Sequence, residues 1–369
     1  MAPRKEESLS LYQRVLERTA LGYSLLRSLN YTGQFLTLPV IERLATGIKK
    51  EALPNFPQSL LAAWADILKL LEKDSHNMAA GLYPFEVLRP ETPTRHAWRL
   101  SRILRDGIKV AKRRAQKNSK DFQSVEPESL AELPPYARRN YHFQTGGYAS
   151  EESAELYEHQ VEILFSGSAD AMRRLVIAPL RRQLKSQDGE GLHFLEIGAG
   201  TGRLSRFMKM AFPKARFVVS DMSPEYLKKA REQLQDFKRV DFVQAWGEKL
   251  PFQDQVFDVV YSCFLFHELP RETREEVLKE SRRVLKPEGL LGVVDSIQTG
   301  DAPEFEWALQ LFPQDFHEPF YKNYQIHPLE EALKKSGFAL LEKDRGFLSK
   351  ALVARKTGST RGSAKPSKS

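Results

Sequence analysis

A glycine-rich turn carries the clearest chemical signal in the sequence. Residues 195–203 read Leu-Glu-Ile-Gly-Ala-Gly-Thr-Gly-Arg, between a run predicted to be a strand and one predicted to be a helix. Glycines at such a turn let the backbone bend tightly and let a ligand approach it closely. The spacing is G-x-G-x-G, and Arg203 stands where the dinucleotide fingerprint requires a small residue. We predict a polar ligand at this turn, with a purely structural turn as the alternative.

An acidic residue ends the next apolar run. Asp221 follows Phe-Val-Val-Ser at 217–220, and a carboxylate there can accept two hydrogen bonds from a ribose diol. Asp221 and Ser223 also precede a helical run that starts at Pro224, so helix capping is the alternative. We favour the ribose role.

The segment after the fourth predicted strand holds candidate proton-transfer groups. Residues 264–270 read Phe-Leu-Phe-His-Glu-Leu-Pro and should lie at the carboxyl edge of the sheet, where ligands bind in this architecture. His267 is the first candidate for a general base, with Glu268 holding its tautomer. The alternative is that His267 lines the pocket or caps the following helix without moving a proton. A second histidine in H-E-x-x-H spacing is absent, so we exclude a metalloprotease and expect no metal.

The elements that must position these residues alternate between strand and helix patterns. We predict strands at 193–197, 216–220, 240–244, 256–262, 290–295, 339–343 and 349–355, with helices between most of them. Seven such strands fit one sheet with helices on both faces. The pattern predicts a Rossmann-like α/β domain over residues 146–355, with helices at 151–165 and 169–184 before the first strand.

A smaller all-α region is predicted ahead of this domain, over residues 1–145. Its helical patterns cover 9–28, 38–49, 59–72 and 97–117, and the proline-bearing stretch 121–139 is typical of a linker. At the other end, residues 356–369 are rich in Gly, Ser, Thr, Lys and Arg, which predicts a disordered basic tail.

Composition excludes several classes of protein. The chain has 369 residues, 41% of them hydrophobic, and no apolar run approaches the roughly 18 residues that span a bilayer. Its first residues lack the apolar core of a secretory signal, so we expect a cytoplasmic location. The lone Cys263 cannot form an internal disulfide, and the Cys and His spacings do not match a structural zinc site.

Five motifs, taken in order, resemble the class I S-adenosylmethionine (SAM)-dependent methyltransferases over about residues 190–355. Residues 196–202 resemble the family's first motif and Asp221 its acidic second-strand residue. Residues 248–252 (Glu-Lys-Leu-Pro-Phe) resemble its "LPF" turn, 257–260 (Phe-Asp-Val-Val) its fourth strand, and 283–289 (Arg-Val-Leu-Lys-Pro-Glu-Gly) its "LKPGG" turn. Within this superfamily, the motifs are most similar to the group that includes ubiquinone and menaquinone methyltransferases.

The resemblance implies SAM as the cofactor and assigns residues to it. The implied roles are Gly198, Gly200 and Gly202 at the methionine portion, Asp221 at the ribose, Met222 at one face of the adenine, and Glu196 orienting the glycine loop. Ala199, Gly247, Glu248 and Cys263 complete the implied cofactor site. Many relatives carry Asp or Asn before the "LPF" turn, whereas this chain has Trp246, which either stacks on or flanks the adenine or is a packed surface aromatic.

Two further segments are candidates to enclose the substrate. Residues 140–148, with Tyr141 and Tyr148, form a dense aromatic and polar loop, and in many relatives such a segment folds over SAM. Residues 312–324, with His317 and Tyr321, lie where the family often inserts a substrate cap. Interdomain packing is the alternative for both segments.

The function implied by the resemblance is in-line transfer of the SAM methyl group to an O, N or C atom of a small organic acceptor, lipid and quinone-like acceptors included. The alternatives are methylation of RNA or protein, a catalytically silent SAM-binding scaffold, and a nicotinamide-dependent dehydrogenase. The glycine spacing and the later turns argue against the dehydrogenase.

The helix predicted at 97–117 is basic and amphipathic, in a chain of net charge +8. A solvated charged face is the simplest interpretation of the surface at 97–118. The other interpretations are an anionic membrane, nucleic acid and a protein partner. By analogy with relatives that methylate lipids, we prefer peripheral membrane contact among these; between residues 100 and 118 the sequence has no aromatic residue that could stack on a single strand.

Overall fold

The computed structural model describes residues 9–47, 56–122, 125 and 127–358. At its centre is a seven-stranded sheet with the order β3-β2-β1-β4-β5-β7-β6. The strands are β1 (His193–Ile197), β2 (Arg216–Asp221), β3 (Val240–Gln244), β4 (Phe257–Cys263), β5 (Leu285–Ser296), β6 (Phe338–Gly346) and β7 (Ser349–Lys356). Neighbours from β3 to β5 pair in parallel, whereas β7 runs antiparallel to β5 and β6. The predicted Rossmann-like α/β fold is confirmed.

The central strands form because their apolar runs are buried on both faces of the sheet. In β1, Phe194 belongs to one hydrophobic cluster while its neighbour Leu195 belongs to another. In β4, Val259 and Val260 divide in the same way, as the alternation of side chains along a strand requires. A parallel strand covered on both faces therefore has a continuous apolar sequence, which made these strands easy to predict.

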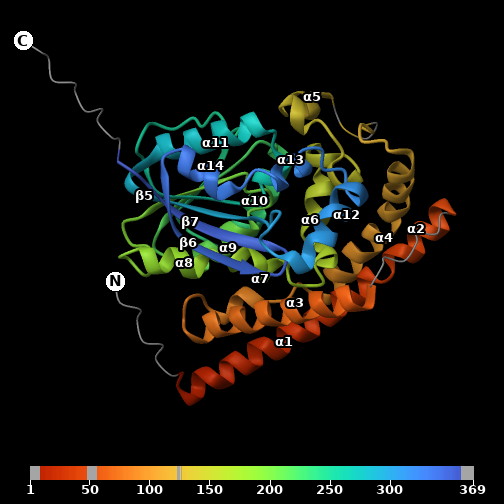
Figure 1. Cartoon of the computed structure of the whole chain (residues 1–369), viewed down its shortest axis with the longest axis horizontal. Helices are drawn as coiled ribbons and strands as arrows, with labels where there is room; N and C mark the ends of the chain where they lie inside the picture. Colours follow the sequence, from red (N-terminus) through yellow and green to blue (C-terminus); the bar gives the residue numbers. More distant parts are fainter. Residues whose placement is uncertain (1–8, 48–55, 123–124, 126, 359–369) are drawn as a thin grey trace, which may run out of the picture.

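Helices cover both faces of the sheet (Figure 1). Leu180 of α8 (Ile177–Gln183) and Phe207 of α9 (Arg203–Ala211) pack in the cluster on one face. Val277 of α11 (Arg271–Val284) and Leu333 of α14 (Leu329–Lys335) pack in the cluster on the other. The remaining helix that follows a central strand is α10 (Pro224–Leu234), which packs on β2 and β3.

The residues before the sheet fold as helices. They form α1 (Leu11–Phe35), α2 (Leu38–Thr46), α3 (Phe56–Ala79), α4 (Pro93–Gln116) and α5 (Pro127–Ala131). Figure 1 shows α1 and α3 side by side along one edge of the molecule, with α2 and α4 at one end of them. Leu70 and Leu71 of α3 share a hydrophobic cluster with the sheet domain. A domain boundary at residue 145 stays a prediction, and none of the described helices is long and apolar enough to cross a membrane.

Several element bounds differ from the sequence prediction. Helix α1 continues to Phe35 rather than to residue 28, and α3 continues to Ala79 rather than to residue 72. Strand β5 begins at Leu285, so the "LKPGG"-like segment is part of the strand, next to an irregularity in its pairing with β4. The predicted helix at 38–49 and the predicted tail at 356–369 extend in part outside the described residues.

Short turns carry the chain over the carboxyl edge of the sheet. They are η2 (Pro135–Ala137), η3 (Tyr141–Phe143) and η4 (Gly147–Ala149), followed by α6 (Glu151–Leu164) and α7 (Ala169–Arg174). The segments that follow β4 and β5 lie at this edge as well. After β4 comes η5 (Phe266–Glu268), and after β5 come η6 (Pro303–Phe305), α12 (Glu306–Asp315) and α13 (Tyr321–Gln325). The Ser223 hydroxyl, at the start of α10, donates a 2.6 Å hydrogen bond to the Tyr148 carbonyl and ties the first group to the sheet.

Candidate functional site

The glycine turn between β1 and α9 depends on backbone that favours glycine. Gly198 has φ +64° and Gly202 has φ +76°, both in the left-handed region. A Cβ at Gly198 would lie 2.8 Å from Cδ1 of Leu265, and one at Gly202 would lie 3.0 Å from Cβ of Ala230. The turn is therefore packed between the segment after β4 and helix α10.

Asp221, at the end of β2, binds this turn. Its Oδ2 accepts a hydrogen bond of 2.7 Å from the Gly200 amide, and its Oδ1 accepts one of 2.8 Å from the Ser223 amide. Burial raises the pKa of Asp221 to about 6, although both backbone bonds favour the carboxylate. The capping role weighed as an alternative belongs to Ser223, whose hydroxyl accepts from the Tyr226 amide at 3.1 Å.

The Glu196 side chain contacts helix α9, whereas the sequence led us to expect it to orient the glycine loop. The Ser205 hydroxyl, within α9, donates to its carboxylate and also lies 2.7 Å from the Tyr261 hydroxyl. Burial raises the pKa of Glu196 to about 8. Its role in orienting the glycine turn stays a prediction.

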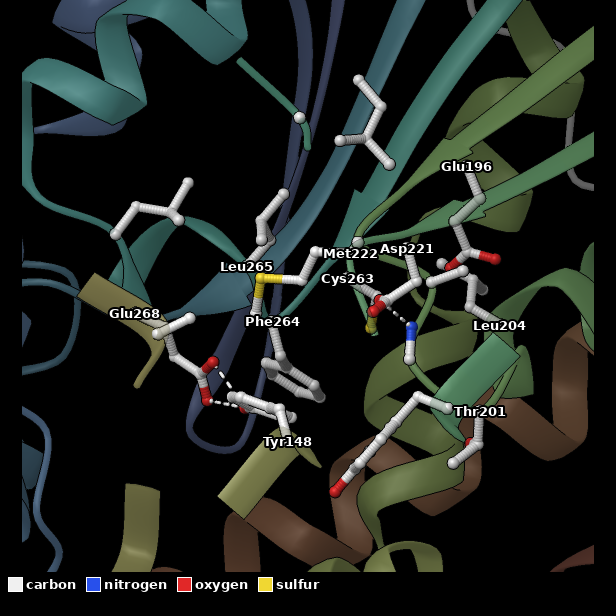
Figure 2. Close-up of a pocket in the computed structure, with 18 of the residues that line it drawn as sticks. Tyr148, Glu196, Thr201, Leu204, Asp221, Met222, Cys263, Phe264, Leu265 and Glu268 are labelled. Atoms are coloured by element: carbon white, nitrogen blue, oxygen red, sulfur yellow. Dashed lines mark hydrogen bonds between the residues drawn. The ribbon is translucent and has the colours of Figure 1, made fainter. Parts of the chain in front are cut away.

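A cavity lies between the glycine turn and the segment 136–148 (Figure 2). It contains about 910 Å³ of empty space, part of it open to solvent. Its lining includes these residues singled out from the sequence: Glu196, Gly198, Ala199, Gly200, Asp221, Met222, Gly247, Glu248, Cys263, Tyr141, Tyr148 and Glu268. Among the described residues, five others from the same prediction lie outside the lining: Gly202, Trp246, His267, His317 and Tyr321.

Trp246 is a surface aromatic rather than a wall of the cavity. Its side chain is 38% exposed, and its backbone forms a bridge with Lys249 across a tight turn. The residues on either side of it, Ala245 and Gly247, do line the cavity. The structure therefore supports the interpretation of Trp246 as a packed surface aromatic and contradicts its stacking on a ligand in this cavity.

The expected pairing of His267 with Glu268 is wrong. His267 Nδ1 lies 2.6 Å from Oδ1 of Asp295, and its Nε2 lies 3.8 Å from Oε2 of Glu318. Burial opposes charge on this imidazole, but the two carboxylates outweigh it and raise the pKa of His267 to about 9. His267 is thus a cation at neutral pH, a state in which it cannot accept a proton.

Glu268 instead faces the cavity and binds Tyr148. The Tyr148 hydroxyl lies 2.6 Å and 2.5 Å from the two carboxylate oxygens, to one of which it donates. His142 Nε2 lies 3.6 Å from Oε1 of Glu268 and 3.0 Å from Oε1 of the buried Glu318. Burial opposes charge on His142, but these two carboxylates raise its pKa to about 10. Charged groups thus extend in a chain from the cavity to Asp295 on β5.

Roles for His142, Glu318 and Asp295 were missed from the sequence, although two of them lie in segments singled out there. Asp295 offered a usable signal, because it stands near the end of an apolar strand as Asp221 does. The pairing of His142 with Glu318 joins residues that are far apart in the chain, and local spacing does not report it.

Three tyrosines hold the segment 136–148 over the cavity. Besides the Tyr148 contact, the Tyr136 hydroxyl donates to Glu248 at 2.9 Å, and the Tyr141 hydroxyl donates to the backbone carbonyl of Glu268 at 3.2 Å. This position is the one that a lid requires, and its role in catalysis stays a prediction.

His317 and Tyr321 pack the second segment against its surroundings. The His317 ring lies 5.7 Å from that of Phe143, and the Tyr321 hydroxyl lies 2.6 Å from that of Ser296. These contacts fit the packing alternative.

Much of the basic charge of α4 is paired within the chain. Arg99 lies 2.6 Å from both Glu91 and Glu155, and Arg102 lies 2.8 Å from Glu152. The Arg113 side chain is buried and donates to the Phe143 carbonyl at 2.9 Å. Part of this helix therefore fastens the helical region to the sheet domain, while Arg105, Lys109 and Lys112 remain exposed.

One group of side chains has a composition that suits a metal. Glu91, His96 and His159 bring ligand atoms within 4.8 Å of one another. The amide of Gln34 already binds both imidazoles, at 3.0 Å and 2.8 Å, and Glu91 pairs with Arg99. Protein partners account for these contacts, so we assign no metal to the group.

A parallel sheet with a glycine turn after β1 and a buried acid at the end of β2 defines a Rossmann-like site for an adenosyl ligand. Residues 194–289 match the methyltransferase domain family. The ubiquinone/menaquinone biosynthesis C-methyltransferase UbiE of Bordetella avium is 32% identical over 180 residues, which are 46% of this chain and 68% of that relative. The chain belongs to the class I SAM-dependent methyltransferases, and SAM is the cofactor of this class.

Other relatives match over a smaller share of their length. The UbiE protein of Ectopseudomonas mendocina is 34% identical over 161 residues, and the match spans 39% of this chain and 62% of that relative. Among solved structures, a SAM-dependent methyltransferase from Aquifex aeolicus aligns with a TM-score of 0.39 and 20% identity, over 54% of this chain and 98% of that one.

Proposed function

We propose that this chain transfers the methyl group of SAM to a small organic acceptor that binds beside Tyr148 and Glu268. The proposal rests on the lining of one cavity. The glycine turn and Asp221 line one part of it, and Glu268, whose carboxylate accepts from the Tyr148 hydroxyl, lines another. Figure 2 shows Asp221, Tyr148 and Glu268 around the same space, which would bring a cofactor and an acceptor together.

The residues present fit the adenosyl cofactor. The positive-φ turn at Gly198 and Gly200 leaves backbone without side chains at the cavity, where the methionine portion would lie. The Asp221 carboxylate is buried but lines the cavity, so it would accept from the ribose hydroxyls, and Met222 beside it would contact the adenine. When bound, SAM supplies a methyl group already activated on a sulfonium.

Glu268 is the group proposed to receive the acceptor's proton. Methyl transfer from bound SAM would leave S-adenosylhomocysteine, a neutral thioether, and an acceptor O–H, N–H or C–H would have to give its proton to a group of this chain. Glu268 lies at the cavity wall, where the Tyr148 hydroxyl donates to its carboxyl group and His142 Nε2 lies 3.6 Å from Oε1. His267, already protonated, acts behind it by holding Glu318 and Asp295 in place.

For the acceptor we propose an aromatic, quinone-like ring. The relatives are named C-methyltransferases of ubiquinone and menaquinone biosynthesis, which motivates an acceptor whose nucleophile is a ring carbon. Tyr136, Tyr141, Tyr148, Tyr157 and Tyr226 all line the cavity. Such walls offer aromatic faces and edges to a ring. Methylation of RNA or protein, and silent SAM binding, are the competing outcomes.

The test begins with calorimetric titration of SAM, S-adenosylhomocysteine and NAD, followed by transfer of labelled methyl groups to phenols, quinols and RNA. Glu268→Gln should lower turnover about 100-fold to 10,000-fold, the usual contribution of a general base, with SAM affinity unchanged. Glu288→Gln, an exposed glutamate on β5, is the matched control. Turnover at the wild-type rate in Glu268→Gln would remove Glu268 from this role. SAM binding without transfer to any acceptor class would favour the scaffold.

A further inference from the structure

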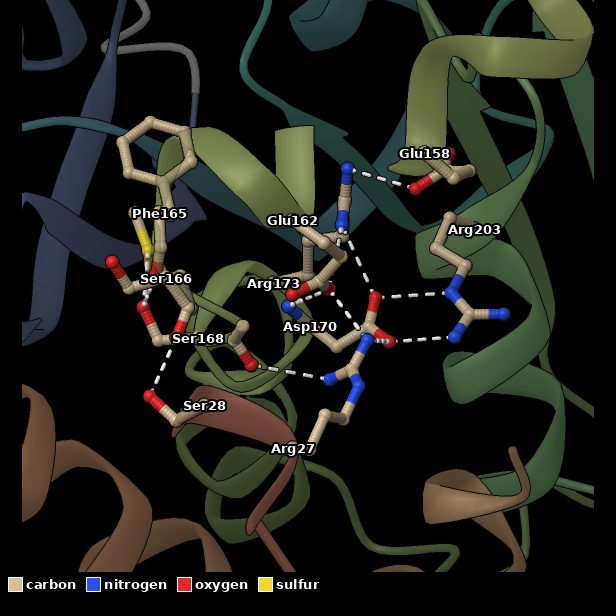
Figure 3. Close-up of polar contacts among 12 residues, drawn as sticks. Arg27, Ser28, Glu158, Glu162, Phe165, Ser166, Ser168, Asp170, Arg173 and Arg203 are labelled. Carbon is tan, nitrogen blue, oxygen red and sulfur yellow. Dashed lines mark hydrogen bonds and ion pairs between the residues drawn. The ribbon is translucent and has the colours of Figure 1, made fainter. Parts of the chain in front are cut away.

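Helix α1 packs on the rest of the chain through small and polar side chains together with Tyr31 and the partly buried Leu21, Tyr23 and Leu25. The buried residues of α1 are Ala20, Ser24, Ser28, Tyr31 and Gln34. The Ser28 hydroxyl donates to the Ser166 carbonyl at 2.5 Å, and a Cβ at Gly167 would lie 2.9 Å from Cα of Ser28. The backbones of α1 and the turn before α7 are therefore in close contact, as Figure 3 shows around Ser28 and Ser166.

A buried ionic network fixes the rotation of α1 about its axis. Arg27 lies 2.9 Å from Glu162 of α6 and 3.1 Å from Asp170 of α7. Asp170 also pairs with Arg173 and with Arg203 of α9 (Figure 3). Removing one member would leave buried charge without its partner, which is costly. The side of α1 opposite Arg27 therefore faces away from α6 and α7.

That outward side is the apolar one. Leu11, Val15, Leu26, Leu29 and Leu36 fall in one narrow sector at 100° per residue, and we call these five residues the α1 stripe. Each member exposes more than half of its surface, from 57% for Val15 to 81% for Leu11. An amphipathic helix ordinarily buries this side against its own core. Here Leu21 and Leu25 are partly buried against the core, while the α1 stripe stays exposed, which indicates a surface that is covered in use.

Cations are exposed on α1 itself and on the adjacent helix. Arg14 and Arg18 are exposed on α1 next to Val15, and Lys69 is exposed on the adjacent α3. Among the described residues of α1 to α4, the exposed charged side chains are Arg14, Arg18, Arg43, Lys69, Arg95, Arg105, Lys109, Lys112 and one acid, Glu72. An anionic surface would complement this charge.

We propose that the α1 stripe docks on an anionic membrane surface, with the axis of α1 along that surface. Exposed apolar side chains with arginines beside them can insert at the headgroup level of an anionic membrane. A second copy of this chain, stripe against stripe, would bring like charges together. Nucleic acid would use the cations but would leave the leucines exposed. The proposal does not depend on methyl transfer. It concerns α1, whereas the membrane contact expected from the sequence concerned the basic helix α4.

The test uses the full chain and sedimentation with vesicles of phosphatidylcholine, alone or mixed with phosphatidylserine. Wild type should bind the anionic vesicles, and added salt should weaken the binding. The double variant Leu26→Ser/Leu29→Ser should bind about tenfold less because it buries less apolar surface. Leu340→Ser, which alters an exposed leucine on β6, is the matched control and should bind as wild type does.

A second pair of variants tests the charge without altering an apolar residue. Arg14→Gln and Arg18→Gln should each lower binding to anionic vesicles about fivefold. Thermal unfolding and SAM titration, neither of which needs the stripe, establish that each variant is folded. Equal sedimentation with and without phosphatidylserine, or none with either, would overturn the proposal. So would a dimer in light scattering that Leu26→Ser/Leu29→Ser dissociates, since the stripe would then be covered by a second copy.

Discussion

Replacing Asp221 by alanine should loosen the glycine turn as well as weaken SAM binding. The change removes the acceptors of the Gly200 and Ser223 amides, which lie 2.7 Å and 2.8 Å from the carboxylate oxygens. Each amide left unpaired lowers the free energy of unfolding by about 1 to 3 kcal/mol, and removal of the buried charge restores part of this loss. We expect Asp221→Ala to lower the free energy of unfolding by about 2 to 4 kcal/mol, measured by urea denaturation. Asp221→Asn keeps one acceptor oxygen and should lose about half as much.

The protonation of Asp221 gives this prediction a dependence on pH. Its folded pKa of about 6 lies above the usual range, so the folded state favours the protonated acid. The contribution of Asp221 to stability should therefore fall as pH rises from about 4 through about 6. SAM affinity should rise over the same interval, because only the carboxylate accepts from both ribose hydroxyls. In Asp221→Asn both dependences should be absent.

Calorimetric titration with SAM at pH 5 and pH 8, on wild type and both variants, measures the ligand part. Wild-type unfolding energy in Asp221→Ala would refute its role in holding the turn. Unchanged SAM affinity in both variants would refute the ribose assignment. A wild-type affinity that does not change with pH would show that the carboxylate does not titrate in this range.

Three further predictions concern contacts away from the cofactor. Gly167→Ala should lower the melting temperature by several degrees, because its Cβ would meet the backbone of α1 at φ +77°. Asp74→Asn should cost about 3 to 5 kcal/mol in chemical denaturation because it leaves Arg174 buried without its carboxylate; its control Asp254→Asn, at an exposed pair, should change little. Glu318→Gln should lower the pKa of both paired histidines in NMR titrations. It should also reduce the stability that their raised pKa values supply below about pH 6.5 and lose as pH rises through about 9 to 10, and part of it should remain because Asp295 and Glu268 are still present.

The sheet and the cofactor turn could be predicted closely because local physics determines them. Strand β1 has the predicted bounds, since a buried parallel strand is a continuous apolar run between turn residues. Strand β3 also has the predicted bounds, although it lies at the edge of the sheet and is only partly buried. The glycines at 198 and 202 stand where positive φ is required, so their spacing reports the turn directly. Asp221 follows from its place at the end of β2.

The proton-transfer groups and the orientation of α1 could not be predicted in this way. His142 has φ +57°, uncommon for a residue with a side chain, and this backbone places it between Glu268 and Glu318. Asp295 rather than Glu268 holds His267, because β5 and β4 are neighbours in the sheet although far apart in sequence. In α1, the leucine pattern predicted a helix, but the buried Arg27 contacts decide which side faces inward.

The same ionic network joins the outward stripe of α1 to the proposed cofactor site. Asp170 binds Arg27 of α1 and also Arg203, the first residue of α9 after the glycine turn. Arg173 and Arg203 both line the cavity that contains the turn. A shift of α1 that broke the Arg27 contact would leave Asp170 with excess positive partners on the cavity side and alter the field there. The helical region therefore contacts, through Asp170, residues that line the cavity, and we expect its removal to lower the stability of the proposed cofactor site.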